Sequence, residues 1–276
     1  MTYSEICNRL KDAGIETADW ESALLVEHFC GVDATLARMD VDHVYENEAL
    51  MNAVEQRAAR YPLQYILGEW GFYRQTYYVT PDCLIPRSDT EILVEEAIRC
   101  LPAGARFADL CAGSGCIAVS VLAERPDTTA VAVEKFEKTL EIAKKNAAKN
   151  GVEKRFSPLL ADVLEPLPFA EGTVFDAILS NPPYIVRAEL AELSTEVRAE
   201  PQVALDGGED GLLFYRRILE LHTKHLTPEG ILLLEIGYDQ AAQVLALGAE
   251  YGFTDGRVLR DLGGNNRVVV FKNKRL

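Results

Sequence analysis

The four residues Asn181-Pro182-Pro183-Tyr184 could hold a planar amide or amine, and they follow directly after the apolar run 175–179. Neither proline can donate a hydrogen bond to a β-ladder, and the residue before a proline is pushed out of the α region. The motif therefore predicts a rigid turn at a strand end, in which the Asn181 amide, the carbonyls beside the prolines and the Tyr184 ring face one pocket. Taken alone, the same letters also fit an ordinary proline-rich turn.

A second candidate binding element is the glycine-containing turn that follows the apolar run 107–110. Its residues are Asp109, Cys111, Ala112, Gly113, Ser114 and Gly115, and it leads into a helical run. Glycines at a strand-to-helix turn let a ligand approach the backbone closely and point helix N-terminal amides at it. The turn lacks the third glycine of the dinucleotide fingerprint, which favours S-adenosylmethionine over NAD.

Acidic residues end the next two strand-like runs. Glu134 follows the glycine turn by about 20 residues, where a carboxylate can bind both hydroxyls of a ribose. Asp162, followed by Val163, could accept a hydrogen bond from the exocyclic amino group of adenine. Ligands of open α/β sheets bind outside the carboxyl ends of the strands, so we expect these ends and Asn181 to face one crevice.

The elements that must position these residues alternate along the chain. From residue 107 onward, helical stretches separate short apolar runs at 107–110, 130–133, 159–160, 175–179 and 231–236. This alternation predicts an α/β fold with a mostly parallel sheet covered by helices on both faces. Near the C-terminus, two strand-like runs flank a Gly-Gly-Asn-Asn turn, which predicts one antiparallel strand.

The region before the sheet differs in its pattern. Apolar residues spaced near a 3.6-residue period predict a small helical domain over residues 1–70. Aromatic and β-branched residues over 71–86 predict a hairpin or extended connector closed by Pro81 and Pro86. Residues 87–276 then form the α/β domain.

Composition restricts the classes of partner. The formal net charge is −15, from 43 acidic and 28 basic residues, so the chain lacks the basic surplus of proteins that hold nucleic acid tightly. No apolar run approaches the ~18 to 20 residues of a membrane span, and the N-terminus carries no targeting signal. The six cysteines are scattered, which predicts neither a metal site nor a disulfide framework. We expect a cytoplasmic monomer without direct contact to nucleic acid or membrane.

Together, the segments QYILGEWGFY, LIPRSDTEILVEEA, ILSNPPYI and EPQVALDGGEDGL resemble the HemK/PrmC family of release-factor glutamine methyltransferases, over nearly the whole chain. The resemblance implies a Rossmann-like class I methyltransferase fold with a mostly parallel seven-stranded sheet, preceded by a helical substrate-recognition domain. The family usually has glycine at Cys111, a second proline at Ser88 and aspartate at Glu134.

The resemblance also implies the activity, which is transfer of a methyl group from S-adenosylmethionine to N5 of the glutamine in the Gly-Gly-Gln motif of class I peptide-chain release factors. It assigns catalysis to the Asn-Pro-Pro-Tyr motif, in which the Asn181 side-chain oxygen and the Pro182 carbonyl accept both amide hydrogens of the substrate. Arg87, Thr90 and Glu91 are expected to line the pocket, with Arg87 and Glu91 on the substrate side. No strong general base is evident, and His222 and His225 are expected on a polar helix face. The alternatives are a DNA adenine-N6 methyltransferase and a non-catalytic module of translation.

Overall fold

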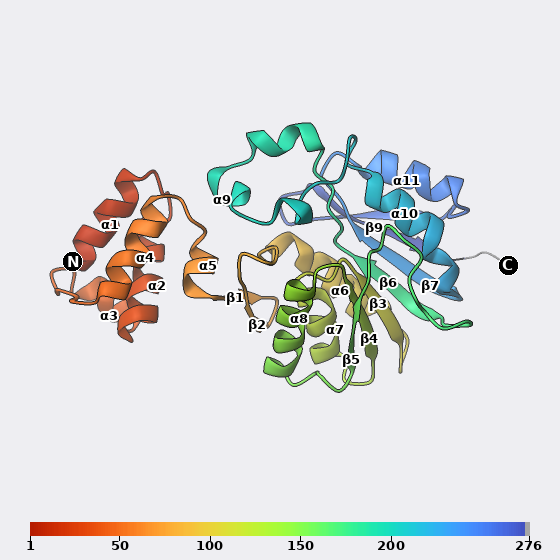
Figure 1. The fold of residues 1–276 in the computed structure, drawn as a ribbon, viewed down its shortest axis with the longest axis horizontal. Helices are drawn as coiled ribbons and strands as arrows, with labels where there is room; N and C mark the ends of the chain where they lie inside the picture. The colour runs from red at the N-terminus through yellow and green to blue at the C-terminus, as the bar shows by residue number, and fades with distance from the viewer. Residues whose placement is uncertain (274–276) are drawn as a thin grey trace. The chain divides into compact units, whose positions relative to one another are not determined.

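The computed structural model describes residues 1–273 and divides into two compact units (Figure 1). The first unit comprises Met1–Glu69 together with the short segment Leu193–Ala199. The second comprises Trp70–Glu192 and the chain from Glu200 onward. No local sequence pattern predicts that a segment from the middle of the α/β region joins the N-terminal helices.

The first unit is helical, as its apolar spacing predicts. Its helices are α1 (Tyr3–Asp12), α2 (Ala18–Cys30), α3 (Ala34–Met39), α4 (Glu48–Ala58), α5 (Leu63–Leu67) and α9 (Thr195–Arg198). Helix α1 begins with a capping box, in which the Thr2 hydroxyl accepts from the Glu5 amide and the Glu5 carboxylate accepts from the Thr2 amide. Ile6, Leu10 and Leu50 are fully buried and form part of the core of this unit.

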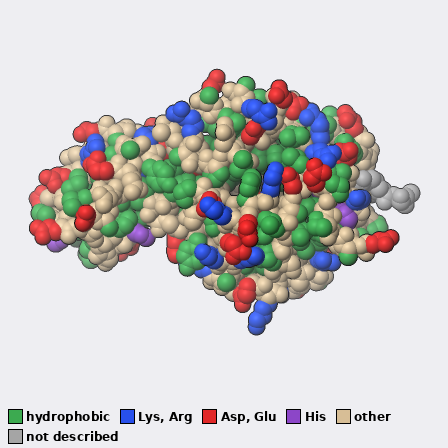
Figure 2. Space-filling model, viewed as in Figure 1, with side chains coloured by type: hydrophobic (Ala, Val, Ile, Leu, Met, Phe, Trp, Pro, Cys, Tyr) green, Lys and Arg blue, Asp and Glu red, His purple; other side chains and the backbone are tan. Residues whose placement is uncertain are grey.

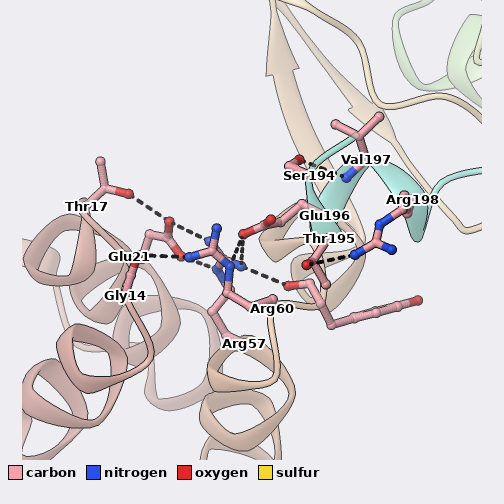
Figure 3. A network of polar contacts seen from close by, with 11 residues as sticks. Gly14, Thr17, Glu21, Arg57, Arg60, Ser194, Thr195, Glu196, Val197 and Arg198 are labelled. Carbon is pink, nitrogen blue, oxygen red and sulfur yellow. Dashed lines mark hydrogen bonds and ion pairs between the residues drawn. The ribbon is translucent and has the colours of Figure 1, made fainter. Parts of the chain in front are cut away.

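A partly buried ion network holds the segment Leu193–Ala199 within the first unit (Figure 3). Arg57 Nε donates to Glu21 Oε2 at 2.5 Å, and Arg57 Nη1 donates to Glu196 Oε1 at 3.2 Å. Arg60 Nε lies 2.7 Å from the same Glu196 oxygen. Because the Arg57 and Glu21 side chains are almost fully buried, removal of one partner would leave an uncompensated charge, which is strongly destabilising.

A two-stranded hairpin spans the start of the second unit and consists of β1 (Glu69–Phe72), whose first residue belongs to the first unit, and β2 (Gln75–Tyr78). Its turn contains Tyr73 in the left-handed region, with φ 56°. The buried rings of Phe72 and Tyr77 meet edge to face at 5.9 Å. Phe72 and Tyr77 therefore belong to the core of this unit, and the predicted hairpin is present.

The main sheet of the described residues has seven strands in the order β5-β4-β3-β6-β7-β9-β8. They are β3 (Arg106–Leu110), β4 (Thr129–Glu134), β5 (Phe156–Leu160), β6 (Phe175–Ser180), β7 (Leu226–Glu235), β8 (Gly256–Arg260) and β9 (Asn266–Lys272). The first five are parallel, and β9 runs antiparallel to both β7 and β8. The mostly parallel sheet with one antiparallel strand confirms the predicted fold class.

Helices cover both faces of this sheet (Figure 1). On one face lie α6 (Glu91–Cys100), α7 (Cys116–Glu124) and α8 (Glu137–Lys149); on the other lie α10 (Leu213–Leu221) and α11 (Ala241–Glu250). Successive strand residues point to opposite faces, so Ala177 and Leu179 pack in the first layer and Ile178 in the second. Short 3₁₀ turns occur at Ser88–Thr90 (η1), Arg187–Glu192 (η2), Gln202–Ala204 (η3) and Thr223–His225 (η4).

The surface of the second unit carries both signs of charge. On the face shown in Figure 2, acidic and basic side chains lie next to one another around hydrophobic patches. Across residues 1–273, none of the helices has the length and apolar character needed to span a bilayer.

Candidate active site

A cavity of about 270 Å³ opens at the carboxyl ends of the parallel strands in the second unit. Most of the predicted site residues line it: Arg87, Cys111, Ala112, Gly113, Ser114, Glu134, Asp162, Val163, Asn181 and Pro183. Thr90 lines it as well. The ends of β3, β4, β5 and β6 therefore meet at one crevice, the arrangement expected of an open α/β sheet.

Five predicted residues, Asp109, Gly115, Pro182, Tyr184 and Glu91, lie outside the lining of this cavity. Asp109 is fully buried beneath the glycine turn, where its Oδ2 accepts from the Ala118 amide at 3.1 Å. Burial raises the pKa of Asp109 to about 7. The Glu91 carboxylate accepts from the Tyr73 amide at 2.8 Å, so Glu91 joins α6 to the hairpin turn.

The turn after β3 uses left-handed backbone three times, at Cys111 (φ 62°), Gly113 (φ 55°) and Gly115 (φ 78°). A Cβ at Gly113 would enter open space, whereas a Cβ at Gly115 would lie 3.1 Å from Ala143 Cβ. Gly115 therefore permits α7 and α8 to approach closely, while Gly113 leaves the cavity floor clear. Cys111 occupies a conformation that glycine adopts at lower energy, since a Cβ costs roughly 1–2 kcal/mol there.

Glu134 connects the glycine turn to the next strand end. Its Oε2 accepts from the Gly113 amide and its Oε1 from the Phe136 amide, both at 3.0 Å. Burial raises the pKa of Glu134, although these two amide hydrogen bonds act in the opposite direction. Each oxygen keeps a further lone pair, so the carboxylate can still accept from two neighbouring hydroxyls in the cavity.

The Asp162 side chain is more exposed than that of Glu134, and it forms an ion pair. Its Oδ2 lies 2.8 Å from Lys135 Nζ, and its Oδ1 accepts from the Leu164 amide at 2.9 Å. Partial burial acts to raise the pKa of Asp162, but the ion pair and the amide bond outweigh it and lower the pKa. The side chain is therefore an ionised acceptor at neutral pH.

The Asn-Pro-Pro-Tyr turn begins where β6 ends. Ser180 Oγ donates to the Leu110 carbonyl at 2.6 Å, which ties the turn to the end of β3. Asn181 Nδ2 donates to Thr90 Oγ1 at 3.1 Å, and the Tyr184 carbonyl accepts from Gln240 Nε2 at 2.9 Å. Both ends of the motif are thus held by neighbouring elements, as a preorganised binding turn requires.

Arg87 is ion-paired at the rim of the cavity. Its guanidinium hydrogen-bonds to the buried carboxylate of Glu200, which also accepts from the Ile85 amide at 3.0 Å. Glu200 directly precedes Pro201, Val203 and Ala204, three residues that line the cavity. Arg87 therefore secures the cavity wall as well as lining it.

Several residues that shape the site were not singled out from the sequence. Asn146 on α8 is fully buried and donates to the carbonyls of Ser114 and Tyr78, which supports the glycine turn. His222, expected on a polar helix face, is instead buried, and its Nε2 lies 2.7 Å from the Val163 carbonyl. That prediction is wrong because a histidine can pack inward when a carbonyl satisfies its ring nitrogen.

Two further residues had a visible signal in the sequence. Glu235 is a lone acid within the apolar run 231–236, and it is almost completely buried at the end of β7. Gly207, in the segment Glu200-Pro201-Gln202 to Gly208, packs against the backbone of Tyr184 so closely that a Cβ would lie 2.7 Å from Tyr184 Cα. This Gly-rich stretch therefore supports the motif turn directly.

Comparison with known proteins agrees with this geometry. Residues 88–243 match the family described as methyltransferase small domain, and residues 2–68 match the PrmC N-terminal domain. The chain is 40% identical over 264 residues to the release factor glutamine methyltransferase of Geobacter sulfurreducens, covering 94% of this chain and 91% of that one. For the protein of the same name from Caulobacter vibrioides the identity is 37%, covering 95% and 92%.

A solved structure shares the fold. The crystal structure of a methyltransferase from Pyrococcus furiosus aligns with a TM-score of 0.54 at 19% identity, covering 72% of this chain and 89% of that one. The chain belongs to the family of release factor glutamine methyltransferases.

Proposed function

We propose that this protein methylates the N5 amide nitrogen of the glutamine in the Gly-Gly-Gln motif of class I peptide-chain release factors, with S-adenosylmethionine as the methyl donor. The observation that carries the proposal is the state of the Asn181 amide. Its Nδ2 is engaged by Thr90, while among residues 1–273 no hydrogen bond to its Oδ1 is found. An amide oxygen held at the cavity wall in this way is an acceptor ready for a substrate N–H.

The residues of the cavity fit S-adenosylmethionine. Gly113 leaves the cavity floor open, and Glu134 keeps lone pairs for the two ribose hydroxyls. Asp162 is ionised and can accept from the adenine amino group, beside Val163. When bound, S-adenosylmethionine supplies an electrophilic methyl group on a cationic sulfonium.

The chain's own contribution to the reaction is orientation. An amide nitrogen is a poor nucleophile because its lone pair is delocalised, so its position must be fixed. In the proposed complex, Asn181 Oδ1 and the Pro182 carbonyl accept hydrogen bonds from its two N–H groups, and the Tyr184 ring lies beside the amide plane. Of these residues only Asn181 lines the cavity, so Pro182 and Tyr184 would meet the amide just beyond the cavity lining. The two prolines keep this geometry rigid, so little conformational entropy is lost on binding. Preorganised acceptors of this kind supply the larger part of the catalysis.

A protein partner suits the charge and the organisation of the chain. With a net charge of −15, attraction to phosphate backbones is weak, whereas a basic protein surface would be attracted. We assign recognition of the release-factor body to the helical region 1–70, and catalysis to 87–276 behind the connector 71–86. A monomer acting on a translation factor in the cytoplasm completes the proposal. If a peptide containing Gly-Gly-Gln matched the intact factor in kcat/KM, the assignment of a recognition domain would fail.

The catalytic assignment is tested by Asn181→Ala, with Asn150→Ala as the matched control. Asn150 donates to the Thr76 carbonyl and lies outside the cavity lining, so its loss should leave turnover unchanged. Loss of the Asn181 acceptor should lower kcat by about 10²–10³-fold, the usual effect of losing one preorganised polar group. Calorimetric affinity for S-adenosylmethionine should change by less than about threefold. A kcat within twofold of the wild type would remove the amide-orientation mechanism.

A further inference from the structure

The side chain of Asn181 has two possible orientations that differ little in shape. Its oxygen and nitrogen are nearly isosteric, so rotation by half a turn would present two N–H donors, instead of the oxygen, to the substrate. A substrate amide that must donate both hydrogens could not bind to that rotated form. Some neighbouring group must therefore select the orientation, and the contact made by Asn181 is to Thr90, at 3.1 Å from Nδ2 to Oγ1.

Thr90 alone cannot make this selection. A threonine hydroxyl both donates and accepts, so it could bind either end of the Asn181 amide. The Thr90 side chain, at the end of η1, is 1% exposed, and it lies close enough to the Glu235 carboxyl group for a hydrogen bond between them to lower the pKa of Glu235. An ionised carboxylate only accepts. Thr90 must then donate to Glu235, which leaves its lone pairs for the Asn181 NH₂.

Glu235 is not explained by packing or by ion pairing. It is the last residue of β7 and is 1% exposed, yet no ion pair is found for it in the described part of the chain. Its Oε2 is buried without a hydrogen-bond partner among those residues. Arg267 on β9 directs Nη2 at Asp89 and Asp261, at 3.2 and 3.1 Å. A buried carboxyl group that is left partly unsatisfied destabilises the fold, so its retention calls for another reason.

We propose that Thr90 and Glu235 are positioning residues for the methyl transfer, because together they orient the Asn181 amide with Oδ1 toward the substrate. The inference rests on the proposed function, since it assumes that Asn181 accepts a hydrogen from the substrate amide. Hydrogen bonds then run in one direction, from Asn181 Nδ2 to Thr90 Oγ1 and from Thr90 to Glu235. None of these three side chains, Asn181, Thr90 and Glu235, needs to move during the reaction.

A dependence on pH follows from the same geometry. Burial raises the pKa of Glu235 to about 7, although the Thr90 hydrogen bond and the neighbouring arginines lower it. Protonated Glu235 can donate to Thr90, and Thr90 can then donate to Asn181 Oδ1, so the selection is lost. The polar and charged groups that face Glu235 from the surrounding elements are Arg87, Asp89, Cys116, Tyr184, Tyr215 and Arg267. Turnover should therefore fall as the pH decreases through about 7.

The test compares Thr90→Val, Thr90→Ser and Glu235→Gln with the wild type. Thr128→Val is the control, because Thr128 is equally buried and donates to the Arg125 carbonyl outside the cavity lining. Thr90→Val should lower kcat about 10- to 100-fold with KM and S-adenosylmethionine affinity within about threefold, and Thr90→Ser should restore most of it. Glu235→Gln should lower kcat and abolish its decrease through pH 7. Thr128→Val should leave kcat unchanged.

A kcat within twofold of the wild type for Thr90→Val, or equal losses for valine and serine, would overturn the inference. Side-chain NMR of ¹⁵N-labelled protein separates this failure from failure of the proposed function, since it needs no substrate. The Asn181 NH₂ signals of the wild type should shift through pH 7, and this shift should be absent in Glu235→Gln. If the Asn181 signals shift as expected while release factors are not methylated, the proposed substrate is wrong, but the orientation of Asn181 by Thr90 and Glu235 stands. If the Asn181 signals do not shift, that orientation is wrong.

Discussion

Replacement of Gly207 by alanine tests whether the Gly-rich segment supports the Asn-Pro-Pro-Tyr turn, to which we assign catalysis. An added Cβ would lie 2.7 Å from both Cα and C of Tyr184, and 2.9 Å from Gly211 Cα. Ordinary contacts of a Cβ begin near 3.4 Å, so the Tyr184 backbone would have to withdraw by about 0.7 Å. These neighbours are backbone atoms, which cannot rotate away as a flexible side chain can.

The displacement should reach Asn181. Gly207 donates to the Ile185 carbonyl at 2.8 Å, and the Tyr184 carbonyl is fixed by Gln240, so the turn cannot shift without breaking these bonds. Two prolines lie between Tyr184 and Asn181 and transmit the shift as a rigid unit. Since a 1 Å misplacement can lower turnover about 10²-fold, we expect a decrease in kcat of at least about tenfold. The free energy of unfolding should fall by about 1–3 kcal/mol.

The assay is steady-state methylation of a release factor, with calorimetric binding of S-adenosylmethionine and urea unfolding measured on the same preparations. Cofactor affinity should stay within about threefold, because Gly113 and Glu134 belong to other strand ends. Gly71→Ala is the matched control, since a Cβ there meets no atom within 4 Å and its backbone is not left-handed. A Gly207→Ala enzyme with kcat within twofold of the wild type would refute the proposed support of the turn.

Two further substitutions test other parts of the site. Glu134→Ala should weaken S-adenosylmethionine binding at least about tenfold in calorimetry, since hydrogen bonds to a charged acceptor contribute about 1.5–3 kcal/mol each; unchanged affinity would contradict the ribose assignment. Asp109→Asn should remove a pH dependence of stability. Because burial raises the pKa of Asp109 to about 7, the folded state holds a proton that the unfolded chain releases above about pH 4. Stability is then lost as the pH rises from about 4 to 7, by up to about 4 kcal/mol. Denaturant unfolding at pH 5.5 and 8 should show a smaller difference for the asparagine variant, and equal differences would contradict the assignment.

Much of the fold followed from local pattern. Apart from Asp176, the run Phe175 to Leu179 is apolar, as expected for a strand buried on both faces, and β6 spans Phe175–Ser180. The sequence pattern predicts β5 only over 159–160, because Pro158 interrupts the apolar run. In the structure the strand begins earlier, at Phe156. That proline is tolerated because β5 lies at the edge of the sheet.

The residues predicted in the glycine turn, at Glu134, at Asp162 and in the Asn-Pro-Pro-Tyr motif were inferred from strand ends, since parallel strands bring their carboxyl ends to one edge. Arg87, Thr90 and Glu91 were expected only from the family resemblance. Contacts between segments that are far apart in the sequence could not be predicted in this way. Glu196 lies in α9, yet it binds Arg57 and Arg60 of the helical unit, and nothing local to residues 193–199 indicates those partners. Glu91 carries a suitable carboxylate beside Thr90, but helix geometry directs it to the Tyr73 amide. Glu235 was visible as one acid in an apolar run, a pattern that deserves a functional explanation whenever it occurs.

The central claim is the identity of the methyl acceptor. The most direct measurement is transfer of labelled methyl from S-adenosylmethionine to a purified class I release factor, beside the same factor with its Gly-Gly-Gln glutamine replaced and beside duplex DNA. We predict label on the intact factor alone, located by peptide mass spectrometry at the glutamine side chain. Label on the substituted factor or on DNA would contradict the proposed substrate, and no transfer to any acceptor would favour a non-catalytic role.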